Sequence, residues 1–232
     1  MSLAPPAGLA ACLNETQPLA LLRALATLQP LEGALRALGR AAAAAGRLAG
    51  EAHDLGEEDC AQATLDEAER LLLQPLPTQA ELEAEDVGAS LGAQLGKQVY
   101  LRVCQTLSQE AAARGDTPTS AVAAAAIYAA GCAQAVEELC LEAMELEDDE
   151  AEELALAVLD PAAQAVFAAA ALSSEERACR AVRDELQAWI DGPDPLATRR
   201  RARAEASYRS PRARELAQRT MTPEALARYG FA

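Results

Sequence analysis

The densest group of possible metal ligands in the chain is the stretch "GEAHDLGEED", residues 50–59. It contains His53, the only histidine, with carboxylates on both sides. Histidine nitrogens and carboxylate oxygens both bind divalent cations. A di-metal centre in a helical bundle, however, takes Glu-x-x-His motifs from paired helices, and the chain has none. We therefore interpret Glu51 to Asp59 as a solvated helix end. A helical-bundle metal binder or enzyme is the weakest of our functional hypotheses.

No other motif indicates catalysis. The chain lacks the phosphate loop G-x-x-x-x-G-K-[ST] and the dinucleotide motif G-x-G-x-x-G. The six cysteines form no C-x-x-C pair, and most lie in apolar stretches, where a thiol behaves as a small hydrophobe. We predict reduced core thiols, no catalytic, metal or cofactor-binding residue, and a protein that is more readily a binder than an enzyme. The cysteines are Cys12, Cys60, Cys104, Cys132, Cys140 and Cys179.

The carboxylates are concentrated in "EELCLEAMELEDDEAEE", residues 137–153, which has ten acidic residues and no basic one. Such a surface repels itself and gains modestly from a cationic partner, less so at high salt. We predict that this acidic face binds a partner, most readily a basic protein. Its residues are Glu137, Glu138, Glu142, Glu145, Glu147, Asp148, Asp149, Glu150, Glu152 and Glu153.

A basic arm follows the acidic body. Residues 1–190 have a formal net charge of −20 and residues 191–232 one of +4, which together give −16. Within the arm, residues 198–214 contain seven arginines and one glutamate. Phosphate contacts through counterion release would suit this cluster, but the acidic body repels a polyanion within about 8 Å at physiological salt. The arginines are Arg199, Arg200, Arg201, Arg203, Arg209, Arg212 and Arg214.

Aromatic residues favour docking of this arm. Three of the seven aromatic residues of the chain, Tyr208, Tyr229 and Phe231, lie in its last 25 residues. A purely solvated tail is normally poor in aromatic residues. We expect these three side chains to anchor the arm on its own body or on a neighbouring subunit. A separate protein partner is the next alternative, and nucleic acid is less favoured.

The helices that must position these residues can be placed from start and stop signals. Thr16 is a candidate cap for a helix of residues 16–28 that stops before Pro30, and residues 31–53 form the next helix. A long helix of about residues 87–114 ends at Gly115, which suits a left-handed position. Ser173 and Glu176 form a capping box that opens a helix to about residue 190.

Two uncharged stretches are expected to form the middle of the fold. Residues 117–136 are twenty residues without a charge, which is the length of a membrane span. They consist mostly of alanine, which drives insertion weakly, so a buried central helix is the better interpretation. The second stretch begins at Pro161, with Asp160 as the predicted N-cap and the proline at the first helical position.

Glycines spaced four apart mark a helix-packing seam. Gly88, Gly92 and Gly96 lie near one face of the predicted helix, although each glycine inside a helix costs about 1 kcal/mol relative to alanine. Close approach of another helix is the expected reason, and a contact between two copies of the chain is the alternative. Glycines 39, 46 and 50 predict a similar seam on the helix of residues 31–53.

The sequence thus predicts an all-α, alanine-rich bundle of about eight to ten helices, with two buried central helices and a basic C-terminal arm. Residues 1–190 form an acidic helical body and residues 191–232 a basic helical appendage, divided at "DGPDP". The N-terminus lacks an export signal, so we expect a cytoplasmic protein without a membrane contact. Its expected function is protein interaction, as a regulator, adaptor, immunity-type inhibitor or assembly chaperone, and a homodimer is compatible with the glycine seam and the arm. A nucleic-acid-associated factor is the alternative.

Overall fold

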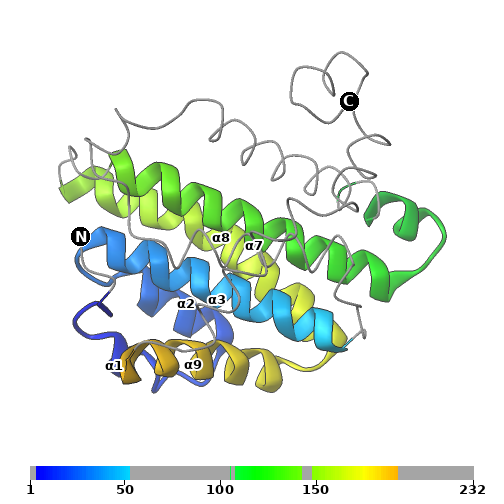
Figure 1. Cartoon of the computed structure of the whole chain (residues 1–232), viewed down its shortest axis with the longest axis horizontal. Helices are drawn as coiled ribbons and strands as arrows, with labels where there is room; N and C mark the ends of the chain where they lie inside the picture. Colours follow the sequence, from blue (N-terminus) through cyan, green and yellow to red (C-terminus); the bar gives the residue numbers. More distant parts are fainter. Residues whose placement is uncertain (1–3, 53–104, 106–107, 143–147, 193–232) are drawn as a thin grey trace, which may run out of the picture.

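The computed structural model describes residues 4–52, 105, 108–142 and 148–192. These residues are mostly helical, and the part of the chain they cover has one isolated β-bridge, between Ala7 and Gln29, but no strand. The predicted all-α class is therefore confirmed. The helices are α1 (Leu9–Cys12), α2 (Pro18–Ala26), α3 (Leu31–Ala52), α7 (Thr117–Glu142), α8 (Asp148–Leu172) and α9 (Glu175–Asp191) (Figure 1).

Helix α3 lies at the centre of the bundle. It packs against α7 and α8 on one side and against α9 and α2 on the other (Figure 1). Its leucines and alanines are buried almost all round the helix axis, including Leu35, Leu38 and Ala41, which are fully buried. Alanine keeps α-helical propensity high and lets neighbouring helices approach closely. The glycines at positions 39, 46 and 50 are buried as well, as expected for residues of a packing seam.

Helices α7 and α8 form an antiparallel pair that packs on α3. The thiol of Cys132 on α7 donates a weak hydrogen bond of 3.9 Å to the backbone oxygen of Val158 on α8. Both helices supply fully buried residues to the core, although the helix that packs against neighbours on two sides is α3. By length and composition, residues 117–136 and 153–172 would also be apolar enough to cross a membrane, a test that core helices pass too.

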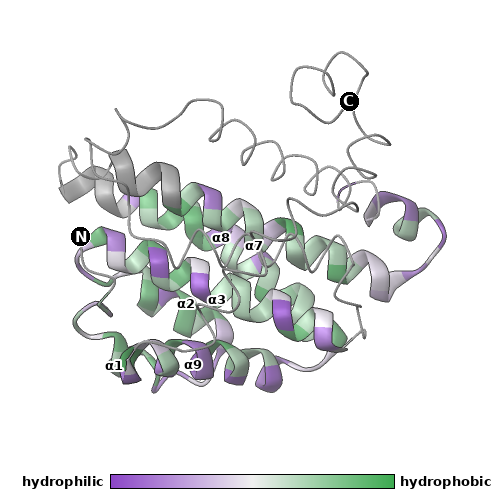
Figure 2. Ribbon diagram, viewed as in Figure 1, coloured by the Kyte–Doolittle hydropathy of each residue, from purple (hydrophilic) through white to green (hydrophobic). Residues whose placement is uncertain are grey.

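Helix α9 covers the opposite side of α3 with an amphipathic surface. Its buried residues recur every three or four positions, which is the period of one helix face. Its hydrophilic residues lie on the outer side in Figure 2, whereas α7 and α8 are largely apolar or neutral. The buried residues of α9 are Ala178, Cys179, Val182, Leu186 and Trp189.

The prediction of a helix start at Pro161 is wrong, because α8 continues through this proline from Asp148 to Leu172. Proline inside a helix removes the bond to the carbonyl four residues earlier and costs about 3 kcal/mol. That carbonyl belongs to Ala157, which is exposed, so water can satisfy it. Burial of Val158, Ala162 and Val166 on both sides of the proline holds the helix together.

Two predicted caps are also wrong by one residue. Helix α9 is capped by Ser174, whose side chain accepts a hydrogen bond from the backbone N–H of Arg177, whereas Ser173 donates its hydroxyl to the carbonyl of Ala169. Helix α2 begins after Gln17, without a side-chain cap, and has Pro18 in its first turn. In both cases the helix begins later than the sequence pattern indicates.

The predicted helix end at Gly115 is confirmed. Its φ angle of 73° is left-handed, the conformation that glycine adopts without strain. The N–H of Asp116 donates to the carbonyl of Ala111, and the N–H of Gly115 donates to that of Ala112. These are the two bonds of a Schellman motif, so the chain turns directly from residues 108–113 into α7.

Candidate functional site

The α7–α8 pair brings the two halves of the predicted acidic face to one end of the bundle. The helices run antiparallel and are separated by residues 143–147 only, so the last turns of α7 lie beside the first turns of α8 (Figure 1). Glu145 and Glu147 fall outside the described residues. Eight of the ten acidic residues are on the helices: Glu137, Glu138, Glu142, Asp148, Asp149, Glu150, Glu152 and Glu153.

No basic residue lies near this acidic end in the sequence. The chain has no lysine or arginine between Arg114 and Arg177. Carboxylates at the start of α8 interact favourably with the positive end of its helix dipole, whereas those at the end of α7 meet the negative end of theirs. No lysine or arginine of α7 or α8 therefore balances the negative charge of the acidic end. The side chain of Glu153, which the structure places, is exposed.

Next to the acidic end, α8 exposes apolar side chains that the sequence interpretation did not single out. Leu156 is 52% exposed and Phe167 is 45% exposed. The offset of eleven residues returns to one side of a helix with 3.6 residues per turn, but Ala163, which lies between them in the sequence, is buried in the core at 6% exposed. Glu153, Asp160 and Gln164 are exposed beside them. We call the five exposed residues, Glu153, Leu156, Asp160, Gln164 and Phe167, the α8 outer face.

The spacing of these residues was visible in the sequence, but the side of α8 that faces the core was not.

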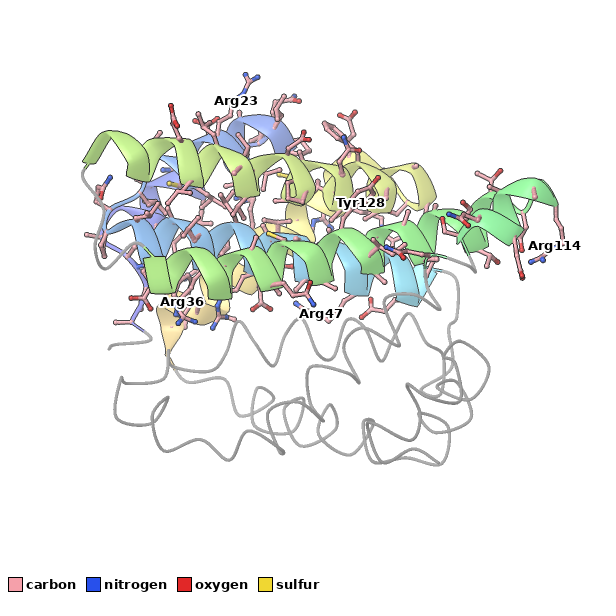
Figure 3. The ribbon with its side chains drawn as sticks, turned by 90° about the horizontal axis from the view of Figure 1, so that it is seen from above. Arg23, Arg36, Arg47, Arg114 and Tyr128 are labelled. Carbon is pink, nitrogen blue, oxygen red and sulfur yellow. The ribbon has the colours of Figure 1, made fainter. Side chains whose placement is uncertain are left out.

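Tyr128 is the other large apolar side chain exposed among the described residues, at 37%. It lies on α7 one turn before Cys132 and is marked in Figure 3. Arg23 of α2, also marked there, is exposed, and α2 packs against α8.

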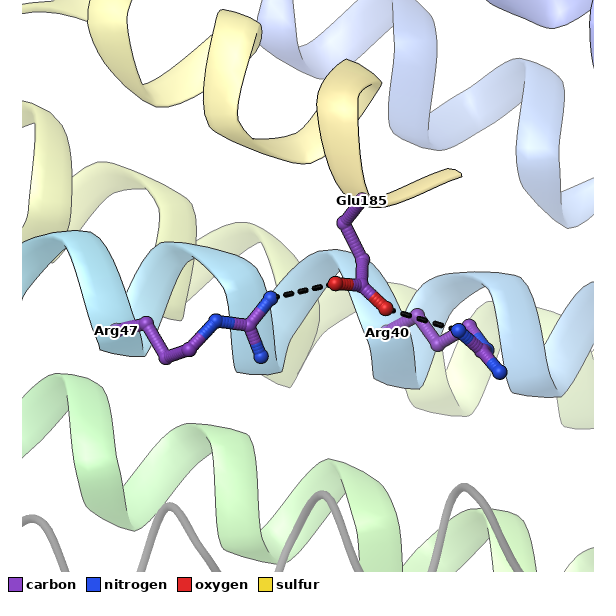
Figure 4. A network of polar contacts seen from close by, with 3 residues as sticks. All are labelled: Arg40, Arg47 and Glu185. Atoms are coloured by element: carbon purple, nitrogen blue, oxygen red, sulfur yellow. Dashed lines mark hydrogen bonds and ion pairs between the residues drawn. The ribbon is translucent and has the colours of Figure 1, made fainter. Parts of the chain in front are cut away.

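A buried ionic cluster joins α3 to α9 and was not predicted. The carboxylate of Glu185 accepts a hydrogen bond of 2.8 Å from Nη1 of Arg40 and one of 2.7 Å from Nη2 of Arg47 (Figure 4). Only about a tenth of the side-chain surface of Arg40 and Glu185 is exposed. Since removing one partner of such a buried cluster leaves uncompensated charge, the cluster couples the two helices strongly.

The guanidinium of Arg40 has a second contact. It lies 4.5 Å from the ring centre of Trp189, within the range of a cation–π interaction. Its Nε atom is buried without a hydrogen-bond partner. Desolvation lowers the pKa of Arg40, and the neighbouring Glu185 opposes this shift. Arg40 therefore holds α9 against α3, and both of its contacts have a structural role.

The thiols of the described core are poorly suited to chemistry. Cys12, Cys132 and Cys179 are free and buried, as predicted for core thiols. Burial raises the pKa of Cys132 to about 12 and also raises the pKa of Cys12 and Cys179. Because the thiolate is the nucleophile and metal ligand, these groups stay inert near neutral pH. The described part of the chain contains no group of three His, Cys, Asp or Glu that could hold a metal ion.

Several predicted site residues lie outside the described residues, so their roles stay predictions. Among the cysteines the same holds for Cys60 and Cys104, and for the side chain of Cys140. The appendage of residues 193–232, the possible ligands 53–59 and the seam of Gly88, Gly92 and Gly96 also lie there. The arm residues concerned are Arg199, Arg200, Arg201, Arg203, Tyr208, Arg209, Arg212, Arg214, Tyr229 and Phe231.

No protein family model, no curated protein and no solved structure matches the chain. The candidate site is therefore defined by its geometry and charge: an acidic end on two antiparallel helices, with two exposed apolar side chains, Leu156 and Phe167, further along α8.

Proposed function

We propose that the chain is a non-catalytic, cytoplasmic protein-interaction module whose acidic end, residues 137–153, binds a basic partner protein. The observation that supports this function is the α7–α8 hairpin, which gathers eight carboxylate residues at one end of a pair of packed helices. A regulator, adaptor, immunity-type inhibitor or assembly chaperone works through such a surface without chemistry of its own.

The physical reason is the field of the acidic end. A cluster of one sign of charge attracts an oppositely charged partner and raises the association rate, an effect that falls with ionic strength. Within α7 and α8 no cation competes for these carboxylates. The charge at the end of α7 also interacts unfavourably with its own helix dipole, so a cationic partner would relieve that repulsion.

The test compares two variants that remove the same number of charges. In the first, the acidic-end variant, Glu138→Gln, Glu142→Gln, Asp149→Asn, Glu150→Gln and Glu153→Gln are combined. The matched control neutralises exposed carboxylates away from the acidic end, through the changes Glu15→Gln, Glu110→Gln, Glu176→Gln, Asp184→Asn and Asp191→Asn. The probe is a fluorescent peptide of alternating lysine and glycine, which has no apolar side chain.

We expect the acidic-end variant to bind the peptide about tenfold more weakly than the wild-type chain, and the control variant less than about threefold more weakly, at about 50 mM salt. Fluorescence anisotropy measures both affinities. Equal losses in the two variants would mean that only the net charge of the chain attracts the peptide, and the proposed binding end would then be wrong.

A further inference from the structure

Helix α9 returns the chain toward the end of the bundle that carries the acidic end. Helix α8 ends at Leu172 and α9 begins at Glu175, so two residues connect them. The two helices pack against each other and run in opposite directions (Figure 1). The last turn of α9 therefore lies toward the end of the bundle where α8 begins, and the basic arm starts there, at Asp191.

The distance from the start of the arm to the acidic end is short compared with the length of the arm. Helix α8 has 25 residues and α9 has 17, so at 1.5 Å per residue α9 stops about 12 Å short of the first turn of α8. Packed helices are about 8 to 10 Å apart. Arg199 follows Asp191 by eight residues, which span up to about 27 Å when extended. The first arginines of the arm can therefore reach the acidic end of their own chain.

Charge distinguishes the two ends of the bundle. At the end opposite to the acidic end, exposed carboxylates already have basic partners: Glu110 pairs with Arg114 at 3.7 Å and Glu176 pairs with Arg180 at 2.6 Å. Arg114 and Arg36 mark the two ends in Figure 3. Arg36, near the start of α3, is buried, and α7 and α8 contain no lysine or arginine. The acidic end is therefore the surface that an arginine-rich segment fits best.

The numbers of charges match as well. The acidic end, residues 137–153, has ten acidic residues and no basic one, whereas residues 198–214 of the arm have seven arginines and one glutamate. A single exposed ion pair contributes little, but several pairs add up, and a segment joined by a short linker has an effective concentration on the order of 1 mM. An affinity too weak to hold a free peptide therefore suffices to hold the arm.

We infer that the arginines of residues 198–214 bind the acidic end of the same chain and compete there with the basic partner. The partner's apparent dissociation constant rises by the reciprocal of the fraction of molecules whose acidic end is free. This inference rests on the proposed function and adds its regulation, because a partner must displace the arm before it binds.

The first experiment measures how fast trypsin cuts the arm of the full chain. Trypsin cleaves after arginine, and its rate follows the population in which the arm is free. Mass spectrometry follows the fragments that end at Arg199, Arg200, Arg201 or Arg203. The wild type is compared at about 50 mM salt with the acidic-end variant and with its matched control, each of which has lost five carboxylates.

We expect the arm of the acidic-end variant to be cut about fivefold faster than the arm of the wild type, and that of the control less than about twofold faster. At about 500 mM salt the wild type should be cut as fast as the acidic-end variant, because salt screens the contact. Equal rates in the two variants at low salt would overturn the inference. Faster cutting of the wild type on dilution, together with a dimer mass by light scattering, would place the arm on a second copy and overturn the intramolecular contact.

The second experiment tests the competition with the lysine–glycine peptide. The arm variant combines Arg199→Gln, Arg200→Gln, Arg201→Gln, Arg203→Gln and Arg209→Gln. The matched control neutralises five exposed arginines of the body, through the changes Arg23→Gln, Arg114→Gln, Arg177→Gln, Arg180→Gln and Arg183→Gln. Both variants have the same net charge, so a difference between them does not come from the overall field of the chain.

We expect the arm variant to bind the peptide about fivefold more tightly than the control variant, because its acidic end is no longer occupied. Fluorescence anisotropy measures both affinities, and circular dichroism checks that both variants stay folded. Equal affinities, or weaker binding by the arm variant, would show that the arm does not compete and would overturn the inference.

The two proposals fail in distinguishable ways. If the acidic-end variant loses peptide affinity as expected while trypsin cuts the arm equally fast in all variants, the acidic end binds a partner and the arm does not regulate it. If the acidic-end variant keeps its peptide affinity, the proposed function is rejected, and the competition inferred here is rejected with it.

Discussion

Helices α3 and α8 have comparable lengths, 22 and 25 residues. The more highly charged helix is nevertheless the more deeply buried one, and the more apolar helix exposes large side chains. Helix α3 contains three arginines and yet is buried almost all round, with Arg36 only 3% exposed. Helix α8 has a twenty-residue apolar stretch and yet exposes Leu156 and Phe167. A charged residue can be buried when a carboxylate meets it, as Glu32 meets Arg36 at 2.9 Å.

Apolar content alone therefore does not locate the centre of an alanine-rich bundle. The centre is the helix whose small side chains let neighbours approach on several sides, and paired charges do not prevent this. An apolar helix at the edge of the bundle keeps part of its surface in water, as α8 does at Leu156 and Phe167. Four measurements test this contrast between α3 and α8.

The largest effect is expected at the carboxylate shared by Arg40 and Arg47. The change Glu185→Ala should lower the free energy of unfolding by about 4 kcal/mol, because it leaves two largely buried guanidiniums without this partner. Urea denaturation measures the loss. The control is Glu176→Ala, which breaks an exposed ion pair with Arg180 and should cost less than about 0.5 kcal/mol. Equal costs would mean that the buried cluster does not hold α9 on α3.

A leucine truncation tests the two helices directly. Leu38→Ala on α3 removes a fully buried side chain and should lower the free energy of unfolding by about 3 kcal/mol through lost burial and a residual cavity. Leu156→Ala on α8 should cost less than about 1 kcal/mol, because half of that side chain is already in water. A large cost at Leu156 would show that α8 has no open side.

The pH dependence of the free energy of unfolding tests whether water reaches the contact between α7 and α8. Because the folded pKa of Cys132 is raised to about 12 from 9.0, stability is intact below about pH 9 and falls as pH rises from there toward about 12. By pH 10 this thiol should account for a loss of about 1.4 kcal/mol. Cys132→Ala should flatten the fall between pH 8 and 10, whereas a wild-type slope in the variant would place water at the thiol.

The smallest effect concerns the start of α9 after α8. Ser174→Ala removes the side-chain acceptor for the N–H of Arg177 and should cost about 1 kcal/mol. Ser173→Ala is the matched control, because its hydroxyl bonds a carbonyl within the preceding turn, and its cost should be under about 0.5 kcal/mol. Thermal unfolding of both variants measures the difference, and the reverse order would restore Ser173 as the cap.

Local signals made much of the fold predictable. The bounds of α3 and the end of α9 agree with the sequence within one residue, since Pro30 and Gly192 interrupt the chain. Gly115 ends its helix as expected because only local backbone geometry is involved. The predicted start at Pro161 failed for the opposite reason: packing along the whole of α8 outweighs the local cost of one proline.

The candidate site was predictable only in part. The acidic run is plain in the sequence, but its placement at one end requires knowing that α7 and α8 pair antiparallel. The exposure of Leu156 and Phe167 is apparent only once the buried side of α8 is known. The partner of Arg40 could not be found locally, because Glu185 lies 145 residues further along the chain, a separation at which helical periodicity carries no information.

Because Arg40 of α3 contacts Trp189 of α9, the fluorescence of this tryptophan reports on the contact between the two helices. Trp189 is the only tryptophan, it is buried on α9, and the guanidinium of Arg40 on α3 covers its ring. Intrinsic tryptophan fluorescence therefore reports the seating of α9 on α3, whereas far-ultraviolet circular dichroism reports all the helices together. If the emission maximum moves to longer wavelength before the dichroism changes, α9 has detached first, which separates release of one helix from global unfolding without any added label.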